Sequence, residues 1–109
     1  MTYNSVLAGR VRHSLEDVSG IVEKVQFGGI GFLLNGNMLC GVIGSDLVVR
    51  VGPAGYEAAL SKPHTRPFDY IGKPMQGWVY VEPAGCQLPE ELQTWVQLGL
   101  NFTASLPPR

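Results

Sequence analysis

Two cysteines and two histidines are among the side chains of this chain that could act as nucleophile, general base or metal ligand. Cys40, Cys86, His13 and His64 are spread along the sequence and do not form the close spacings typical of zinc or redox sites. Cys40 lies in an apolar segment, where a thiol packs as a small hydrophobe. Cys86 falls in a predicted loop, where we expect any thiol reactivity. We predict no catalytic residue, no metal site and no cofactor.

Positive side chains gather in the segment 62–73, which its prolines mark as a loop. With one arginine from a neighbouring strand, they form a candidate anion- or partner-binding patch: Arg50, Lys62, His64, Arg66 and Lys73. Loops on a rigid scaffold carry binding residues more often than the scaffold itself does. In the alternative interpretation, Asp69 pairs with one of these cations and the prolines shape a rigid connection.

Gly28, Gly29 and Gly31 also allow two interpretations. Glycine lets backbone N–H groups approach a phosphate closely, but a phosphate-binding loop needs a helix N-terminus directly after it. Here a further predicted strand follows the glycines. We therefore interpret them as a bulge or tight bend between paired strands.

The positions of all these residues depend on a few clear elements. Apolar residues at helical spacing predict one helix near the N-terminus, a short one after Pro53, and a long one from Pro89 onward. A strand is predicted over 21–27, and the segment 27–53 predicts three more, joined by tight turns at Asn35-Gly36 and after Ile43. Two strands, one of them 78–81, complete the order α-β-β-β-β-α-β-β-α. This order predicts an α+β fold, a two-layer antiparallel sheet flanked by helices.

Length, charge and the N-terminal sequence exclude several classes of protein. With 109 residues the chain is expected to form one domain over 1–109, and its formal net charge of −1 disfavours nucleic acid as a direct ligand. The sequence has no signal-peptide pattern and no apolar stretch long enough to cross a bilayer. We expect a cytoplasmic protein with reduced thiols and no membrane contact.

The hairpin turns predict which strand residues share a face, because side chains alternate along each strand. A two-residue turn at Asn35-Gly36 places Leu33, Met38, Cys40, Val42, Leu47, Val49 and Val51 on one face and Ile30, Phe32, Leu34, Leu39, Ile43, Val48 and Arg50 on the other. A three-residue loop would reverse this relation. Both faces are apolar at the centre, so either helices pack on both sides or a second subunit covers one side. The candidate interface is Ile30, Phe32, Leu34, Leu39 and Ile43.

Several segments, taken in order, carry a resemblance to a known family: Phe27-Gly28-Gly29, Asn35-Gly36 with 38–41, then 47–53, 56–60, 67–81 and 95–107. Together they resemble the N-terminal domain of the TfoX/Sxy competence-regulator family. The resemblance implies a fold similar to that of secretion chaperones and a bacterial cytoplasmic protein associated with transcriptional control of natural competence. Full-length regulators carry a second, helical domain that these 109 residues lack, so we expect a stand-alone domain. The family supplies no catalytic residues.

Three functions from different classes follow. In the leading hypothesis the protein is a non-enzymatic, homodimeric interaction module, with a protein partner in transcriptional regulation implied by the resemblance. The alternative is a protein, or an enzyme, that binds a small molecule or anion through Arg50 and the 62–73 loop. Direct DNA binding is the weakest hypothesis, because the net charge is close to neutral.

Overall fold

A computed structural model describes residues 3–26 and 28–109. Six antiparallel strands form one sheet in the order β1-β2-β3-β4-β6-β5. The strands are β1 (Ile21–Gln26), β2 (Gly29–Leu34), β3 (Asn37–Ile43), β4 (Asp46–Arg50), β5 (Thr65–Pro67) and β6 (Trp78–Val81). The helices are α1 (Ser5–Ser14), α2 (Tyr56–Leu60) and α3 (Pro89–Ala104), with a 3-10 turn over Pro83–Gly85. The predicted α+β class and element order are confirmed; Phe27, predicted at the end of the first strand, lies outside the described residues.

Local signals define where the two longer helices begin. The side chain of Asn4 accepts a hydrogen bond of 3.0 Å from the N–H of Leu7, which satisfies one free donor of the first turn of α1. Pro89 occupies the first position of α3, and the carboxylate of Glu91 accepts the N–H of Leu88 at 2.9 Å. The start of α3 at Pro89 is therefore as the sequence predicts.

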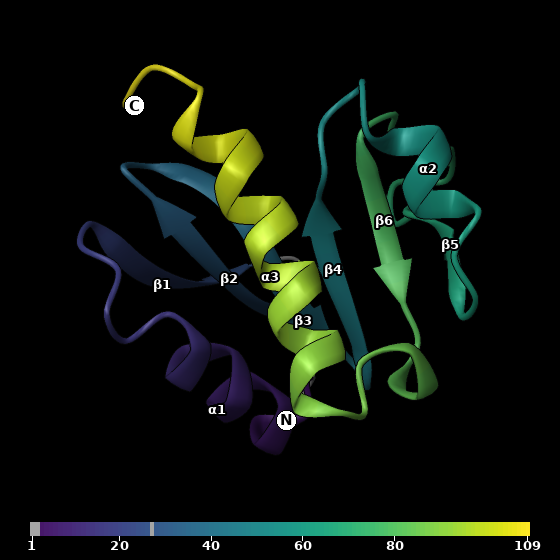
Figure 1. The fold of residues 1–109 in the computed structure, drawn as a ribbon, viewed down its shortest axis with the longest axis horizontal. Helices are drawn as coiled ribbons and strands as arrows, with labels where there is room; N and C mark the ends of the chain where they lie inside the picture. Colours follow the sequence, from purple (N-terminus) through teal and green to yellow (C-terminus); the bar gives the residue numbers. More distant parts are fainter. Residues whose placement is uncertain (1–2, 27) are drawn as a thin grey trace.

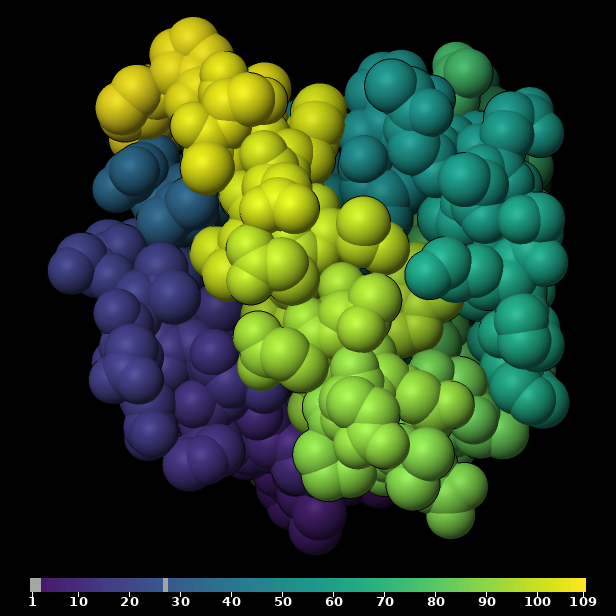
Figure 2. Space-filling model, in the orientation of Figure 1, coloured from purple at the N-terminus to yellow at the C-terminus, as the bar shows by residue number. Residues whose placement is uncertain are grey.

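All three helices pack on the same face of the sheet and share its main core with the strands (Figure 1). The apolar stripe of α3 lies across β3 and β4, and Figure 2 shows this helix covering the middle of that face. Leu92, Trp95 and Val96 are buried there, as their spacing predicts. The architecture has two layers, one of helices and one of strands.

The β2–β3 turn has the two-residue geometry that its sequence predicts. Asn35 and Gly36 have φ angles of 51° and 87°, and Leu34 pairs with Asn37 directly across the turn. A turn in which both central residues have positive φ is a type I′ turn. The twist of this turn type matches the twist of the flanking strands.

A β-bulge follows this turn and makes the predicted face assignment wrong. Leu33 pairs with Met38, but Phe32 pairs with Cys40, so Leu39 is an extra residue on β3. Beyond the bulge, the register between β2 and β3 is shifted by one residue. Each β2 side chain therefore shares a face with the β3 side chains that simple alternation placed on the opposite face. Ile30 and Phe32 therefore lie on the same face as Cys40.

The predicted interface does not exist as one surface. Ile30, Phe32, Leu34 and Leu39 are buried in the main core beneath the helices of the same chain, with Phe32 and Leu39 fully inaccessible. Ile43 lies on the opposite face, in a smaller cluster. The helix-free face is instead covered in part by the segment 68–77, which packs Phe68 against Val48 and Tyr80.

The glycine-rich β1–β2 connection is a bend between strands, as interpreted from the sequence. Gly28 has a φ of 70°, and Gln26 pairs with Gly29 across the turn. A side chain at Gly29 would overlap the backbone oxygen of Val42, and β2 rather than a helix follows. The connection therefore lacks the helix N-terminus of a phosphate-binding loop.

Candidate functional site

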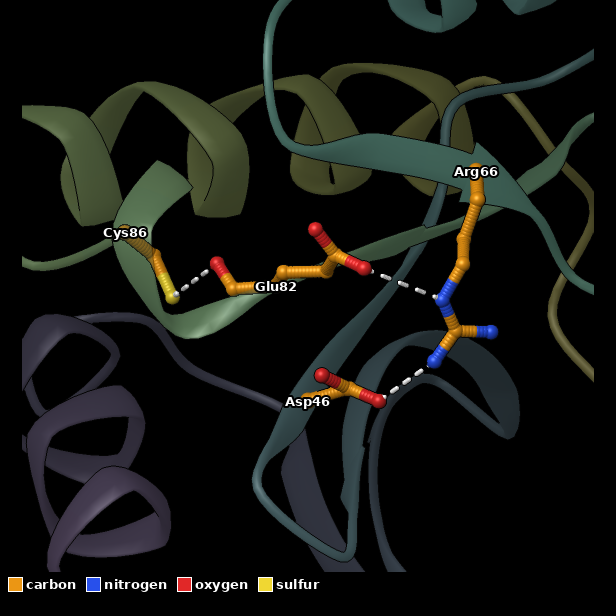
Figure 3. Close-up of polar contacts among 4 residues, drawn as sticks. All are labelled: Asp46, Arg66, Glu82 and Cys86. Atoms are coloured by element: carbon orange, nitrogen blue, oxygen red, sulfur yellow. Dashed lines mark hydrogen bonds and ion pairs between the residues drawn. The ribbon is translucent and has the colours of Figure 1, made fainter.

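Arg66, one of the predicted binding cations, is already paired with carboxylates. Its guanidinium donates to Asp46 at 2.6 Å and lies 3.5 Å from Glu82, an arrangement drawn in Figure 3. The same group lies over the ring of Tyr80, 4.1 Å from its centroid. These contacts link β4, β5 and β6 on the helix-free face. Asp69, the acidic partner proposed from the sequence, is not the residue that pairs with Arg66.

The other predicted cations lie in three separate places. Arg50 sits at the end of β4, with its guanidinium carbon 5.2 Å from the ring centroid of Trp78. Lys62 lies on the helix side of the molecule, where its ammonium is 5.2 Å from the ring centroid of Trp95. His64 lines the same hollow as Lys62, beside Trp95, whereas Lys73 is exposed in the connection before β6. The five residues do not converge on one ligand.

Arg50 instead belongs to a groove on the helix-free face. This groove has a volume of about 600 Å³ and is lined by three cations and an apolar floor: Lys24, Arg50 and Arg109, with Gln26, Leu33, Gly36, Met38, Met75 and Trp78. Side chains of β1, β2, β3, β4 and β6 meet here because these strands follow one another in the sheet. No Asp or Glu side chain is among the described residues that line it.

The electrostatics of the groove are set by burial and by like charges. Partial burial lowers the pKa of Arg50, and the positive charge of Arg109 lowers it further. Arg109 reaches the groove because its N–H donates to the carbonyl of Asn35 at 2.9 Å, which holds the last residue beside the β2–β3 turn. The groove therefore presents concentrated positive charge on a protein whose net charge is −1.

Sequence reasoning identified Arg50 but missed Lys24 and Arg109. Those two residues are far from Arg50 in the chain and occur without a local motif. The alternation of β1 places Lys24 on the face opposite the helices, which is a signal that the sequence did contain. Only strand order brings it to the same groove as Arg50.

The outer edge of β1 is a second exposed feature. Val22 and Val25 are 61% and 70% exposed, and β1 is the last strand on its side of the sheet. By contrast, the opposite edge strand β5 has three residues and includes a proline. Short strands and prolines protect sheet edges from further pairing, so β1 is the edge that remains open to another strand.

The two thiols are not reactive groups in this fold. Cys40 is fully inaccessible and burial strongly raises its pKa. Cys86, which the sequence placed in an accessible loop, is instead 1% exposed, and burial raises its pKa as well. Its thiol points to the carbonyl oxygen of Glu82 at 3.8 Å (Figure 3). The expectation that Cys86 is an accessible thiol is therefore wrong.

The described residues contain neither a metal-binding cluster nor a membrane-spanning helix. No cluster of His, Cys, Asp and Glu side chains within residues 3–26 and 28–109 has the geometry of a metal site. No helix in the same ranges has the length and apolar character needed to cross a bilayer. A larger hollow than the groove, about 990 Å³ between α1 and α3, is lined by side chains of both signs, including Arg10, Asp17 and Glu90.

Comparison with known proteins gives one match. The family model of the TfoX N-terminal domain matches residues 13–103, nearly the whole chain. No curated protein and no solved structure matches this chain. The similarity to secretion chaperones thus stays a prediction.

Proposed function

This chain belongs to the TfoX N-terminal domain family, and we propose that it is a non-enzymatic protein-interaction module that acts as a homodimer in the bacterial cytoplasm. The open edge of β1 is the observation that carries the proposal. The most specific part of the proposal is a regulatory role, which the family links to competence. The isolated thiols and the carboxylate-paired Arg66 support the absence of a catalytic centre.

The backbone of β1 has free hydrogen-bonding groups along its outer side. Asn35 donates its N–H to the carbonyl of Gly20, which sets the phase of the β1–β2 ladder. Hydrogen bonds alternate along antiparallel strands, so the N–H groups of Val22 and Lys24 face β2 while that of Val25 points outward. A second strand can therefore pair with β1 without disturbing the existing ladder.

Charge determines how two copies of β1 would pair. In a two-fold symmetric antiparallel pair the central residue lies opposite its own copy, and like charges there are destabilising. Registers centred on Glu23 or Lys24 are therefore disfavoured, because each would place two like charges opposite each other. A register centred on Val25 places two exposed valines in contact and sets Lys24 opposite Gln26 of the second copy.

Light scattering after size exclusion tests this dimer. We expect Val25→Pro to yield a monomer, because proline removes the outward N–H of Val25 and leaves the donors to β2 intact. Val25→Thr is the matched control, since it keeps both the N–H and the β-branched shape and should remain dimeric. Circular dichroism checks that both variants are folded.

Three results would contradict the proposed dimer. They are a wild-type monomer across micromolar concentrations, a dimer that survives Val25→Pro, and a Val25→Thr variant that dissociates while folded. A broader test is to capture partners from the native bacterial lysate. A reproducible partner that belongs to the transcription machinery supports the regulatory part of the proposal.

A further inference from the structure

We propose that the groove on the helix-free face binds an extended acidic segment of a partner protein that also carries apolar side chains. This inference deepens the proposed function, because it names the chemical class of partner and a site distinct from the β1 edge. The three cations of the groove, Lys24, Arg50 and Arg109, determine the charge of the occupant.

Two of the cations, Lys24 and Arg50, are available to a ligand because no carboxylate of the described residues neutralises them. Among the described residues, Lys24 and Arg50 form no ion pair, whereas Arg12 and Arg66 each pair with carboxylates. Arg50 is held between the rings of Trp78 and Phe102, at 5.2 and 5.3 Å from their centroids. Its charge is thus positioned by aromatic rings and lacks a carboxylate partner.

The floor of the groove is apolar and contains adaptable side chains. The Met38 side chain lies over the paired glycines Gly31 and Gly41, and its sulfur accepts a hydrogen bond of 3.4 Å from the amide of Gln26. Methionine is flexible and polarisable, and such side chains adapt to varied apolar partners. Met75 and Trp78 form the apolar end of the groove.

The extent of the groove favours a chain over a small ion. Lys24 lies on β1 and Arg50 on β4, so three strand spacings, or about 14 Å, separate these two cations, and the groove continues one strand further to Trp78 on β6. A single small anion cannot reach cations spread over that span, but an extended peptide of about six residues can. Nucleic acid fits less well, since Arg50 lies over the Trp78 ring and occupies a face on which a base could stack.

Fluorescence anisotropy with a labelled peptide tests the proposal directly. The probe is the hexapeptide Asp-Leu-Asp-Phe-Asp-Leu, and the reference peptide has Asn in place of each Asp. We expect saturable binding of the acidic probe, no binding of the reference, and an affinity that falls as salt is added. The experiment is repeated with monomeric Val25→Pro protein, so that failure of the dimer and failure of the groove are read separately.

Matched variants locate the binding. Arg50→Met keeps the aliphatic cover on Trp78 and Phe102 but removes the charge, and Lys24→Gln changes an exposed side chain. Each should weaken the probe about fivefold, the upper range for an exposed ion pair. Lys62→Gln removes the same charge on the helix side and should leave binding unchanged.

Each other outcome overturns the proposal. These outcomes are absence of saturable binding, equal affinity for both peptides, and equal effects of Lys62→Gln and Arg50→Met. Tighter binding of a single-stranded hexanucleotide than of the peptide would assign the groove to nucleic acid. Loss of the dimer in both Arg50→Met and Lys24→Gln would assign it to a second copy of this chain.

Discussion

Phe32 lies opposite Cys40 across the β2–β3 ladder, although the turn between these strands would place Leu39 opposite it. Alternation along β2 points Phe32 toward the helices, where it is fully buried, and the single extra residue on β3 turns Cys40 and Val42 toward the same core instead of the groove that Leu33 lines. One bulge therefore decides which side chains build the core and which are available for binding.

The alternation of side chains along β2 predicts opposite effects for two neighbouring glutamate substitutions. Phe32→Glu should prevent folding, because it buries an unpaired carboxylate in the main core at a cost of several kcal/mol. Leu33→Glu, on the half-buried groove floor, should leave the fold intact. Circular dichroism and thermal melts measure both. A folded Phe32→Glu variant would contradict the face assignment of the structure.

The β2–β3 turn predicts a strong dependence on glycine at one position. Gly36→Ala should lower the free energy of unfolding by about 1–2 kcal/mol, since Gly36 has a φ of 87° and a Cβ there would lie 2.7 Å from the backbone oxygen of Arg109. Gly9→Ala is the contrast, because Gly9 lies inside α1 with open space around it. That change should raise stability by about 0.5–1 kcal/mol. Equal effects in urea titrations would contradict this assignment.

The ion pair between α1 and β1 predicts a pH-dependent contribution to stability. Arg12 donates two hydrogen bonds to Glu23, one of them 2.7 Å long, and these bonds lower the pKa of the carboxyl group. A lowered folded-state pKa adds stability above the unfolded value of about 4.3, and this contribution is lost as the pH falls through the folded value. Glu23→Gln should therefore cost at most about 1 kcal/mol at neutral pH, because the pair is partly exposed.

The cost of Glu23→Gln should be smaller in acid, because the contribution falls as the pH drops below the unfolded pKa, and denaturant titrations at pH 7 and pH 3 can measure this. In an Arg12→Gln background, the second change should have little effect at either pH. A cost that persists unchanged at pH 3 would show that Glu23 stabilises the protein by packing and not by charge.

The buried thiols predict slow alkylation of the folded protein. Burial raises the pKa of both Cys40 and Cys86, so a smaller fraction is thiolate at any pH below those values. Iodoacetamide at pH 8 should modify neither residue rapidly until guanidinium unfolds the chain. Cys86→Ser identifies which thiol reacts. Rapid modification of one thiol in the native protein would contradict the burial of that site.

Much of the fold could be predicted from local signals. The apolar stripe of α3 and the Asn35-Gly36 turn each depend on residues close together in sequence, and each appears as predicted. Local spacing determines such features because helix faces and tight turns are formed by neighbouring residues. The family and the element order were therefore within reach of the sequence.

The bulge at Leu39 required the tertiary structure, because no glycine or proline at that position announces it. The backbone oxygen of Leu39 lies so close to α3 that a Cβ atom on Gly99 would be 2.5 Å from this oxygen. Gly99 appeared in the sequence only as one member of an apolar stripe, and its small size is explained by this contact. A contact between a strand and a helix sixty residues later cannot be recognised from either segment alone.

The binding surface was decided in the same way. Sequence identified Arg50 as a candidate, but grouped it with loop cations that the structure places elsewhere or pairs with carboxylates. Its true neighbours, Lys24 and Arg109, come from the first strand and the last residue of the chain. Composition and periodicity determine which elements form, whereas strand order and register determine which distant charges meet, because these depend on packing across the whole sheet.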